Sequence, residues 1–349
     1  MKLHIVTGFL GSGKTTAIYK AATLLIKQNI PVAVITNDQG SRLVDGDLFT
    51  ALGIPGRQVK GGCFCCNYNE LDKNIHSLTH TEGSSLVFAE AVGSCTDIIA
   101  TVLKPLQEFH PEIGLTISTF TDIRLLKMML DGNHSFDESV AYIYHKQLEE
   151  AEIVIVNKTD LVNDEIINDI AKQLSARYSG KLLLFQNSLS EPDILQWLAL
   201  LDNYRRNSLP DSLVVDYDIY ATGEAKMAWY DQQLELYTEY NDAGQIAEQL
   251  INSIYTEIVQ LQVPIGHVKF LVDSTTKISF TGKDEEPVKL QLQPASTSAI
   301  LVNIRVQETP DRIHELIGKI LIRFRQKCKV NSTEAEVFSP GYPTPVYRM

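Results

Sequence analysis

The sequence predicts an α/β fold with a mainly parallel sheet covered on both faces, followed by a smaller C-terminal α+β domain. In the N-terminal part, short apolar runs alternate with segments whose apolar residues recur at helical spacing. Beyond residues 204–212 this alternation stops and longer strand patterns surround two helical ones. Apolar strands that alternate with helices are typical of βαβ units, whose parallel sheets are buried on both sides.

The first domain is expected over residues 1–205. Its strands are predicted at residues 2–7, 31–36, 85–90, 113–119, 152–156 and 181–185. Its helices are predicted at residues 15–27, 97–109, 123–130, 138–149, 165–176 and 192–201. Because ligands of such sheets bind at the carboxyl ends of the strands, the residues that follow each strand are the ones to inspect for function.

The segment 204–212 is polar, contains Pro210 and marks the domain boundary. The second domain is expected over residues 213–329, as a mixed sheet with two helices on one face. Its strands are predicted at residues 213–220, 228–237, 267–272, 278–281 and 299–306, and its helices at 243–262 and 310–327. Residues 330–349 contain three prolines and no periodicity, which predicts an extended tail.

Composition indicates an ordinary cytoplasmic protein. The chain has 349 residues, of which 44% are hydrophobic, and a formal net charge of −12, which argues against nucleic acid as a main partner. No apolar run approaches the roughly 18 residues of a membrane span, and a first strand at Lys2 leaves no room for a signal peptide. Five cysteines in such a chain favour metal or redox chemistry over a disulfide framework.

A phosphate-binding loop follows the first strand. The segment fits G-x-x-x-x-G-K-[ST] and lies between a predicted strand and a predicted helix, as that motif requires. Backbone N–H groups of such a loop surround a polyphosphate at the positive end of the helix. The alternative is a glycine-rich turn without a ligand. The residues expected to bind nucleotide are Gly8, Gly11, Ser12, Gly13, Lys14, Thr15 and Thr16, with Lys14 on the β and γ phosphates and Thr15 on Mg²⁺.

The sequence N-K-T-D after the strand at residues 152–156 predicts specificity for guanine. The carboxylate of Asp160 can accept hydrogen bonds from N1–H and the 2-amino group of guanine, whereas adenine offers neither donor. Polar rejection of this kind can reach about 10⁴-fold. Lys158 can lie along the base, and Asn157 can connect this segment to the phosphate loop. The expected ligands are therefore GTP and GDP.

A second motif is Gly61-Gly62-Cys63-Phe64-Cys65-Cys66. Three cysteines in four residues are difficult to explain by packing, and adjacent cysteines form only a strained disulfide ring. Thiolates bind Zn²⁺ or another thiophilic divalent metal, and three of them supply three corners of a tetrahedron. The alternative is a reduced, buried turn in which Cys63, Cys65 and Cys66 act as small hydrophobic residues.

The fourth corner of this site stays open at the level of the sequence. His76 and His80 are four residues apart on a predicted helix and could chelate, although solvated surface histidines are the more common case. Cys95 closely follows a strand and can approach the same region, with a buried structural thiol as the alternative. Cys328, in the second domain, is expected to be structural.

Two acidic residues end strands beside the phosphate loop. Asp38 follows the strand at residues 31–36 and Glu90 ends the strand at residues 85–90. Either can join Thr15 around Mg²⁺ and take part in hydrolysis together with Lys14. Gly93 lacks a side chain, so its N–H can approach the γ-phosphate, and a methyl group there is expected to obstruct that contact alone. The alternative role for both acidic residues is helix capping.

In this order, GFLGSGKTT, GGCFCC, the E-x-x-G of residues 90–93 and NKTD resemble the CobW-type GTPases, relatives of the UreG, HypB and MeaB proteins. The resemblance implies a slow GTPase that acts as a metallochaperone or inserts a cofactor into a client metalloenzyme or corrinoid protein. It also implies that Cys63, Cys65 and Cys66 are thiolate ligands under nucleotide control, and that Asp38 and Glu90 belong to the Mg²⁺ and switch region.

The chain departs from that family at two points. The family often has N-E-F-G-E where this chain has Asn37-Asp38-Gln39-Gly40-Ser41, so the second acidic residue is missing, and the histidine-rich tract common in such proteins is absent. Two hypotheses follow. One is a GTPase that delivers a metal or corrinoid, and the other is a nucleotide-gated metal or redox sensor with incidental hydrolysis. The client is not specified by the sequence, and a homodimer is compatible with it.

Overall fold

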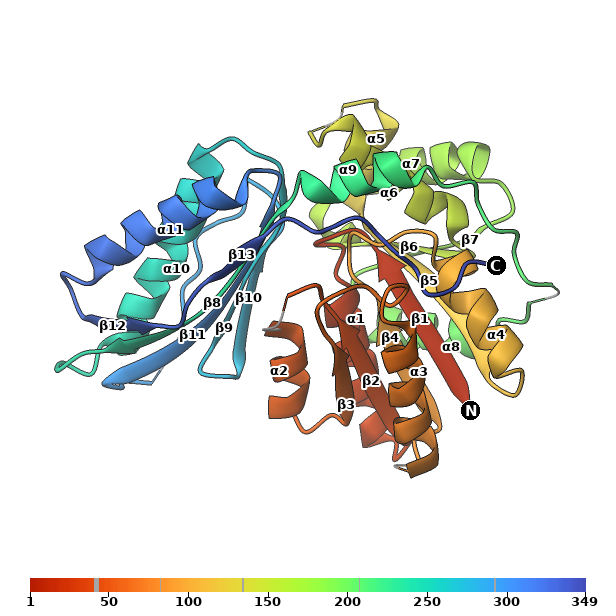
Figure 1. Cartoon of the computed structure of the whole chain (residues 1–349), viewed down its shortest axis with the longest axis horizontal. Helices are drawn as coiled ribbons and strands as arrows, with labels where there is room; N and C mark the ends of the chain where they lie inside the picture. The colour runs from red at the N-terminus through yellow and green to blue at the C-terminus, as the bar shows by residue number, and fades with distance from the viewer. Residues whose placement is uncertain (41–43, 82, 134, 207, 292) are drawn as a thin grey trace. The chain divides into compact units, whose positions relative to one another are not determined.

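The computed structural model describes residues 1–349 except 41–43, 82, 134, 207 and 292, and it gives no side-chain environment for residues 80 and 81. The chain divides by its internal contacts into two units (Figure 1). Unit 1 comprises residues 1–39, 53–223 and 342–349, and unit 2 comprises residues 40–52 and 224–341. These limits differ from the predicted domains because one short segment, residues 40–52, packs with the second unit, and the last eight residues pack with the first.

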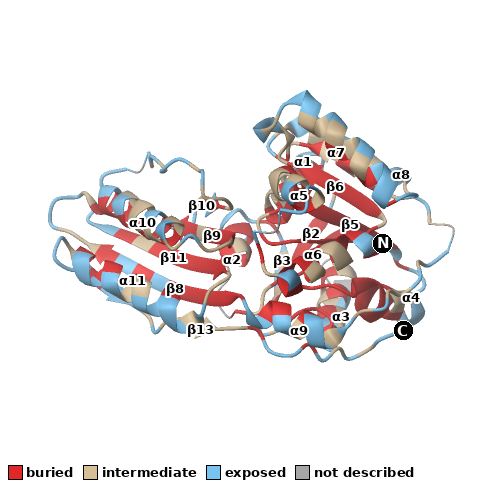
Figure 2. Cartoon of the chain, turned by 90° about the horizontal axis from the view of Figure 1, so that it is seen from above, coloured by how far each residue is buried: buried red, intermediate tan, exposed pale blue. Residues whose placement is uncertain are grey.

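Unit 1 is built on a seven-stranded sheet in the order β3-β2-β4-β1-β5-β6-β7, in which every neighbouring pair is parallel. The α/β fold class is therefore confirmed. Every residue of β4 and of β6 is buried, as expected for a sheet with helices on both faces (Figure 2). The strands are β1 (Lys2–Gly8), β2 (Val32–Asn37), β3 (Gly56–Val59), β4 (Leu86–Glu90), β5 (Gly114–Asp122), β6 (Ile153–Asn157) and β7 (Leu182–Gln186).

The helices of unit 1 match the predicted helical patterns and add α9, which the sequence did not indicate. The helix expected around His76 is α3, which ends at that residue. Short π-helical turns occupy Ser77–Thr81 and Ile99–Leu103, and a 3-10 turn occupies Thr159–Leu161. The helices are α1 (Lys14–Lys27), α3 (Tyr68–His76), α4 (Lys104–Phe109), α5 (Ile123–Leu130), α6 (Glu138–Glu150), α7 (Asp164–Arg177), α8 (Glu191–Asn203) and α9 (Tyr217–Ala225).

The predicted strand at residues 213–220 is wrong, because α9 begins inside it. The carboxylate of Asp216 accepts hydrogen bonds from the backbone N–H groups of Asp218 and Ile219, at 3.0 and 3.1 Å. Such capping satisfies donors that would otherwise be left unpaired at a helix start. The local capping interaction therefore outweighs the β-propensity of the apolar residues around it.

Unit 2 is an α+β sandwich with a six-stranded sheet in the order β10-β9-β11-β8-β12, with β13 also paired to β8. The predicted mixed direction is wrong: each pairing between its named strands is antiparallel. The elements are α2 (Val44–Ala51), β8 (Ala228–Tyr237), α10 (Ala243–Gln260), β9 (Ile265–Val272), β10 (Thr276–Phe280), β11 (Thr297–Val306), α11 (Pro310–Phe324), β12 (Lys329–Ser332) and β13 (Glu336–Phe338).

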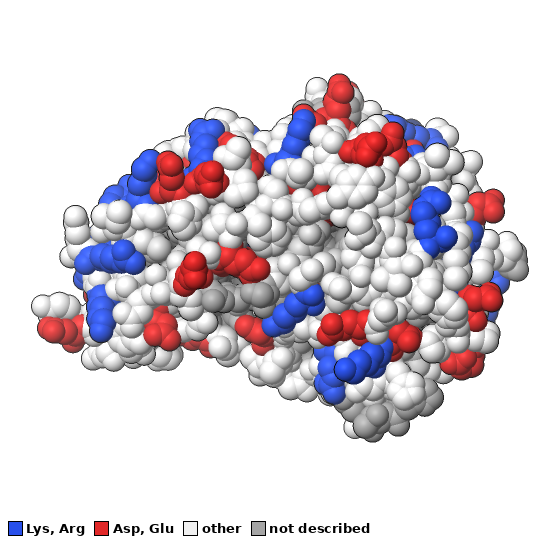
Figure 3. Space-filling view, in the orientation of Figure 1, with Lys and Arg blue, Asp and Glu red and all other residues white. Residues whose placement is uncertain are grey.

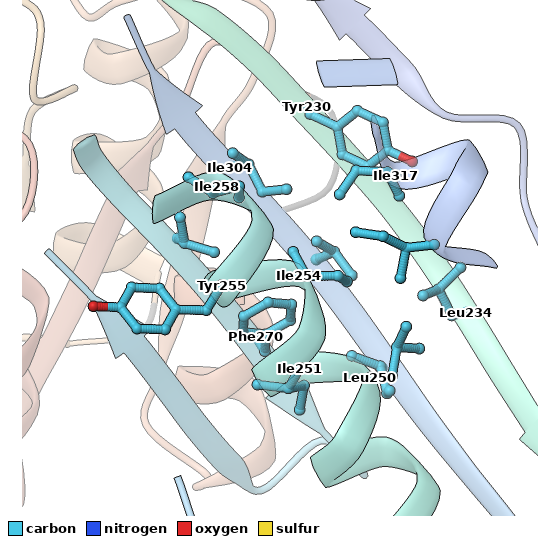
Figure 4. Close-up of a cluster of buried hydrophobic side chains, with 14 of the residues drawn as sticks. Tyr230, Leu234, Leu250, Ile251, Ile254, Tyr255, Ile258, Phe270, Ile304 and Ile317 are labelled. Atoms are coloured by element: carbon cyan, nitrogen blue, oxygen red, sulfur yellow. The ribbon is translucent and has the colours of Figure 1, made fainter. Parts of the chain in front are cut away.

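The core of unit 2 lies between one face of this sheet and the helices α10 and α11. Figure 4 shows Leu250, Ile254 and Ile258 of α10 and Ile317 of α11 against Tyr230 and other residues of the sheet. These positions alternate along each strand with residues of the other face, as the pleat requires. The two predicted helices on one face are therefore observed.

The other face of the same sheet carries α2. Val44 and Leu48 form a small apolar cluster with Leu271 and Leu301, and the carboxylate of Asp45 pairs with both Lys269 and Lys277 at 2.6 Å. These contacts explain why the segment after β2 belongs to unit 2.

The C-terminal residues are more structured than the predicted tail. They contain β12 and β13, both paired with β8, and then an extended segment, residues 342–349, that belongs to unit 1.

Among the described residues, no helix combines the length and apolarity that crossing a membrane requires. On the face that Figure 3 shows, acidic and basic side chains are interspersed in small groups.

Candidate functional site

The loop between β1 and α1 has the geometry of a phosphate-binding site. Gly8, Gly11 and Gly13 have positive φ angles of 123°, 74° and 91°, which L-residues rarely adopt. Among the described residues, no side chain caps the N-terminus of α1 at Gly13, and the buried hydroxyl of Ser12 has no hydrogen-bond partner. Unsatisfied donors at the positive end of a helix fit an anionic ligand such as a phosphate.

Lys14 crosses this loop. Its Nζ donates to the carbonyl oxygens of Gly8 at 2.8 Å and Phe9 at 3.2 Å, and its side chain is buried. The ammonium group is thereby held at the loop, where the motif would place it on the β and γ phosphates.

Asn157, at the end of β6, joins the N-K-T-D segment to the phosphate loop as predicted. Its Nδ2 donates to the carbonyl oxygen of Ser12 at 2.8 Å, and a Cβ atom at Gly13 would lie 2.3 Å from this same Nδ2. Glycine is therefore required at position 13 for space as well as for backbone conformation. Ser188, which follows β7, donates to Oδ1 of Asn157 through its N–H at 3.0 Å and its hydroxyl at 2.8 Å.

The other three residues of N-K-T-D lie at a turn, and two of them, Lys158 and Asp160, are candidate site residues. Lys158 has a positive φ of 65°, and its Nζ lies 2.8 Å from the carboxylate of Asp122, the last residue of β5. Asp122 also binds Arg124, and these hydrogen bonds lower the pKa of Asp122 below its usual range despite its burial. Asp160 is exposed, so its carboxylate is accessible to a base.

Glu90 and Thr15, two of the residues expected around Mg²⁺, are in direct contact. The Thr15 hydroxyl donates to Oε1 of Glu90 at 2.8 Å, and both side chains are buried. In the sheet register Glu90 pairs with Thr36 of β2, so Asp38 comes two residues later at the same edge. A hydroxyl and two carboxylates are hard oxygen ligands of the kind that Mg²⁺ prefers, so the residues present fit this ion.

Gly93 packs directly against the phosphate loop. A Cβ atom there would lie 2.7 Å from Cδ2 of Leu10 and 2.9 Å from the backbone nitrogen of Leu10. The expectation that a methyl group at Gly93 obstructs only a γ-phosphate contact is therefore wrong. Alanine at this position would displace the backbone of the loop itself.

The thiols of Cys63, Cys65 and Cys66 gather into one cluster. The three sulfur atoms lie within 4.8 Å of one another. In the described part of the chain, they form a group of at least three side chains that could bind one metal ion. The Sγ separations are 2.7 Å between Cys63 and Cys65, 3.3 Å between Cys63 and Cys66, and 3.8 Å between Cys65 and Cys66. Four thiolates around Zn²⁺ lie roughly 3.8 Å apart, so the cluster fits this ion after a small expansion.

Hydrogen bonds among the thiols divide their acidity unequally. Side-chain hydrogen bonds with Cys65, and then with Cys66 and Cys95, lower the pKa of Cys63 well below its usual range. The same bond to Cys63 raises the pKa of Cys65, and its burial adds to this increase. Cys63 is therefore the thiol most easily ionised, and a cation would favour ionisation of the others.

Asn37 fixes the cysteine segment to the end of β2, beside Asp38. Its Oδ1 accepts from the backbone N–H of Phe64 at 2.9 Å, and its Nδ2 donates to the carbonyl oxygen of Gly62 at 2.7 Å. The cysteine segment and one of the two acidic residues are therefore attached to the same strand end.

Of the other candidate ligands, Cys95 is buried and contributes to the lowered pKa of Cys63, but it is not in the group of three sulfur atoms found among the described residues. His76, whose side chain is described, is not in a group of possible metal ligands, and the side chain of His80 lies outside the described residues. Cys328 is in unit 2, where its thiol lies 3.8 Å from the carbonyl oxygen of Phe324.

Residues 342–349, here called the C-terminal strap, cover the cysteine cluster. The N–H of Thr344 donates to Sγ of Cys66 at 3.3 Å, and the N–H of Val346 donates to the carbonyl oxygen of Cys65 at 2.9 Å. The ring of Tyr347 contacts Tyr68 and Phe109, with centroids 5.0 and 5.2 Å away. This contact with the cysteine cluster could not be predicted from the sequence, because the strap carries no periodic pattern or ligand motif.

Two buried side chains of α6, Gln147 and Glu150, bind the segment that follows Glu90. No motif in the sequence indicates these contacts. Gln147 donates through Nε2 to the carbonyl oxygens of Gly93 at 3.0 Å and Cys95 at 2.8 Å. Glu150 accepts from the hydroxyl of Thr96 at 3.2 Å. Burial, together with a smaller effect of the nearby charge of Asp97, raises the pKa of Glu150 to about 8.

The raised pKa of Glu150 predicts that the free energy of unfolding falls as pH rises. Folding favours the protonated carboxyl, so its contribution is complete below the unfolded pKa near 4.5 and is lost as pH rises through about 8. Glu150→Gln should remove this loss, which amounts to roughly 2 kcal/mol between pH 6 and 8. Urea unfolding at both pH values measures it. Glu149→Gln, at a far more exposed site, is the control, and an unchanged pH dependence in Glu150→Gln would contradict the prediction.

Similarity to known proteins agrees with this site. A family model described as CobW/HypB/UreG, nucleotide-binding domain, matches residues 2–184. The zinc chaperone YeiR of Escherichia coli (strain K12) is 30% identical over 169 residues, which cover 47% of this chain and 48% of that protein. The zinc chaperone CobW of Sinorhizobium sp is 22% identical over 214 residues, 51% of this chain and 56% of that protein.

The chain thus spans about half the length of the curated relatives it matches. A solved structure, HypB from Helicobacter pylori in complex with nickel, aligns with 59% of this chain and 90% of that chain at 16% identity, with a TM-score of 0.43. That score is too low to support a statement about this chain.

Proposed function

This chain belongs to the CobW/HypB/UreG family, and we propose that it is a slow GTPase that binds zinc and delivers the ion to a client metalloprotein. The observation that carries the proposal is the cluster of three thiols in the same unit as a complete phosphate-binding loop. Two relatives, YeiR and CobW, are zinc chaperones, which supports zinc as the cargo. A corrinoid cargo has no corresponding support.

In this proposal, the phosphate loop binds GTP and Lys14 stabilises the charge that develops on the γ-phosphoryl group. Mg²⁺, held by Thr15 with Glu90 and Asp38, would neutralise charge on the phosphate oxygens. The contact between Thr15 and Glu90 supports this assignment. Asp160 selects guanine, and Asn157 keeps the base-binding turn in register with the loop.

In this proposal, zinc is the cargo that the cysteine cluster binds and then releases to the client. Cys63, Cys65 and Cys66 bind it as thiolates and release protons as they do so. Asn37 contacts the cysteine segment and adjoins Asp38, which supports a link between the nucleotide and the metal. Coupling between two sites of this kind is typically about 5- to 150-fold in affinity and is reciprocal.

Zinc transfer tests the proposal directly. The full chain is loaded with zinc and Mg²⁺, mixed with a zinc-free acceptor chelator of moderate affinity, and supplied with GTP, GDP or a non-hydrolysable GTP analogue. Transfer should require GTP hydrolysis, and zinc should stimulate that hydrolysis. If transfer proceeds equally in all three nucleotide states, delivery is not coupled to hydrolysis, and the sensor hypothesis is favoured instead.

The proposed site predicts a strong preference for GTP over ATP, on the order of 10⁴-fold in affinity, because only guanine satisfies the Asp160 carboxylate. Asp160→Asn replaces one acceptor by a donor and should shift the preference toward xanthine nucleotides. Calorimetry with GDP, ADP and XDP measures this. Asp164→Asn, at the start of α7, is the control and should bind GDP normally. Equal affinity of the wild type for ADP and GDP would exclude the guanine assignment.

The strap predicts a barrier to zinc release, because Cys63 and Cys65 are buried beneath it. Tyr347→Ala removes two aromatic contacts, each of about 0.5–1.5 kcal/mol, and should open the strap more often. Zinc removal by excess chelator, followed by stopped flow, should be about tenfold faster. Tyr240→Ala, which truncates an exposed tyrosine of unit 2, is the control and should leave the rate unchanged. Equal rates in the wild type and Tyr347→Ala would show that the strap does not limit release.

A further inference from the structure

We propose that the surface of unit 1 beneath the strap is a docking site for a client protein, and that the strap competes with the client for it. The client segment that fits this surface is extended and carries an aromatic residue followed directly by arginine or lysine. The inference rests on the proposed function, because it identifies the kind of client segment that reaches the cysteine cluster. The surface, here called the strap site, is formed by Cys65, Cys66, Tyr68, Asp97, Phe109 and Leu213.

Backbone hydrogen bonds hold the strap in an extended form. The N–H of Val346 donates to the carbonyl oxygen of Cys65 at 2.9 Å, and the N–H of Met349 donates to the carbonyl oxygen of Ala100 at 2.9 Å. Bonds of this kind bind an extended peptide without reading its side chains, which are read separately by the positions that receive them. The strap site can therefore accept a segment of another chain that has the right side chains.

The first side chain that the strap site reads is aromatic. The ring of Tyr347 meets Tyr68 and Phe109 edge to face, with interplanar angles of 84° and 62°. Aromatic rings favour this arrangement, so an aliphatic side chain in the same position would bind less well. Phe109 stays 46% exposed with the strap in place, so this position is open to a ring that arrives from solvent.

The second side chain that it reads is a cation. The carboxylate of Asp97 is buried, and its Oδ2 lies 2.8 Å from Nε of Arg348, whose side chain is 41% exposed. The hydroxyl of Tyr217 donates to the same oxygen at 2.7 Å, and within the described residues Oδ1 of Asp97 has no hydrogen-bond partner. A buried carboxylate that loses its cation is strongly destabilising. A segment that replaces the strap must therefore bring a cation of its own.

The strap covers the cysteine cluster without being able to take the metal from it. The N–H of Thr344 donates to Sγ of Cys66 at 3.3 Å, but the strap sequence, Y-P-T-P-V-Y-R-M, contains no cysteine, histidine, aspartate or glutamate. A client segment in the same place would lie against the same sulfur atom and could carry such a ligand. Exchange of the strap for a client segment would thus bring an acceptor to the zinc ion.

The covalent attachment of the strap makes it an effective competitor. A tethered segment acts at an effective concentration on the order of mM. The apparent affinity of a free segment falls by the fraction of molecules in which the site is open. Weakening the strap should therefore strengthen the binding of a free peptide, although the variant has lost contacts.

Peptide binding to the full chain, without metal or nucleotide, tests the inference. The probe is a fluorescein-labelled synthetic peptide, Y-P-T-P-V-Y-R-M, followed by fluorescence anisotropy. Arg348→Ala removes the cation of the tethered strap and should bind the probe at least about tenfold more tightly than the wild type. Tyr347→Ala is a second opening variant. Arg325→Ala, at an exposed arginine of unit 2, is the matched control and should bind the probe as the wild type does.

Variants of the probe test the chemistry of the client segment. In the Arg348→Ala chain, a peptide that carries Arg348→Ala or Tyr347→Ala should bind about tenfold more weakly than the probe. A peptide with Arg348→Lys, or with alanine everywhere except at Tyr347 and Arg348, should still bind. Adding Asp97→Asn to the protein should abolish the preference for a basic residue and keep the preference for an aromatic one. The peptide variants need no further change in the protein, so their result does not depend on how Asp97→Asn folds.

Three results would overturn the inference. The first is no binding of the probe to the Arg348→Ala chain at about 1 mM, near the effective concentration of a tethered segment. The second is equal binding of the probe and its alanine variants. The third is a wild-type dimer in light scattering that Arg348→Ala dissociates, because the occupant would then be the strap of a second copy. Since the assay contains neither zinc nor GTP, each of these results leaves the proposed zinc and nucleotide sites intact, and failure of zinc binding would leave the peptide result intact.

Discussion

Lys14→Ala is expected to lower the rate of GTP hydrolysis by more than about 10²-fold. The Nζ of Lys14 is held at the phosphate loop by the carbonyl oxygens of Gly8 and Phe9, and the motif places its charge on the β and γ phosphates of a bound GTP. Alanine removes both the charge and these two contacts. Steady-state phosphate release with saturating GTP and Mg²⁺ measures the effect, and GDP affinity measured in parallel separates lost binding from lost catalysis.

Lys20→Ala is the matched control for this variant. Lys20 lies on the same helix, α1, where its Nζ is near the ring of Tyr19, and it has no contact with the phosphate loop in the described interactions. The control should hydrolyse GTP at the wild-type rate. If Lys14→Ala releases phosphate as fast as the wild type, then the loop between β1 and α1 does not hold the reacting phosphate.

The sequence was sufficient to predict the α/β fold of unit 1, because buried parallel strands leave a strong local signal. The strand β6, for example, is a continuous apolar run that ends in Asn157. The short strand β3 was missed since only one of its four residues, Val59, is buried, so it shows neither a continuous run nor alternation.

The division of the chain was harder to predict, because it depends on contacts between distant residues. The sequence near α2 does not indicate that Val44 and Leu48 pack against Leu271 and Leu301. It also does not indicate that Asp45 pairs with two lysines of the unit 2 sheet. The strand predicted at residues 213–220 failed for a local reason. Asp216 caps α9, and this capping favours a helix even though the apolar residues on either side of Asp216 favour a strand.

The same distinction applies to the candidate site. Residues at strand ends were predicted because a parallel sheet brings its carboxyl ends together, and the contacts of Asn157 with Ser12 and of Glu90 with Thr15 fit that logic. The supporting residues were not predicted. Gln147 lies within an amphipathic helix, where a buried glutamine looks like any polar residue, and the strap has no pattern that points to the cysteine cluster.

The combined substitution of Cys63, Cys65 and Cys66 by serine is expected to weaken zinc binding by roughly a thousandfold or more, since thiolate coordination supplies most of the binding free energy. A serine hydroxyl stays protonated near neutral pH and is a poor zinc ligand. The three sulfur atoms lie close together, so serine, which is smaller, should fit without displacing the segment held by Asn37. Competition with a chromophoric chelator of known affinity measures the loss.

The control tests whether the loss of zinc binding depends on the position of the cysteine that is replaced. Cys328→Ser removes a thiol from unit 2 and should bind one zinc per chain with wild-type affinity. The triple variant should also bind GDP normally, because the phosphate loop and the N-K-T-D segment are untouched, and this shows that unit 1 is folded. It should release fewer protons on mixing with zinc, since three thiols no longer ionise. Stoichiometric zinc retained by the triple variant would mean that the metal site lies elsewhere in the chain and that the cysteine cluster is structural.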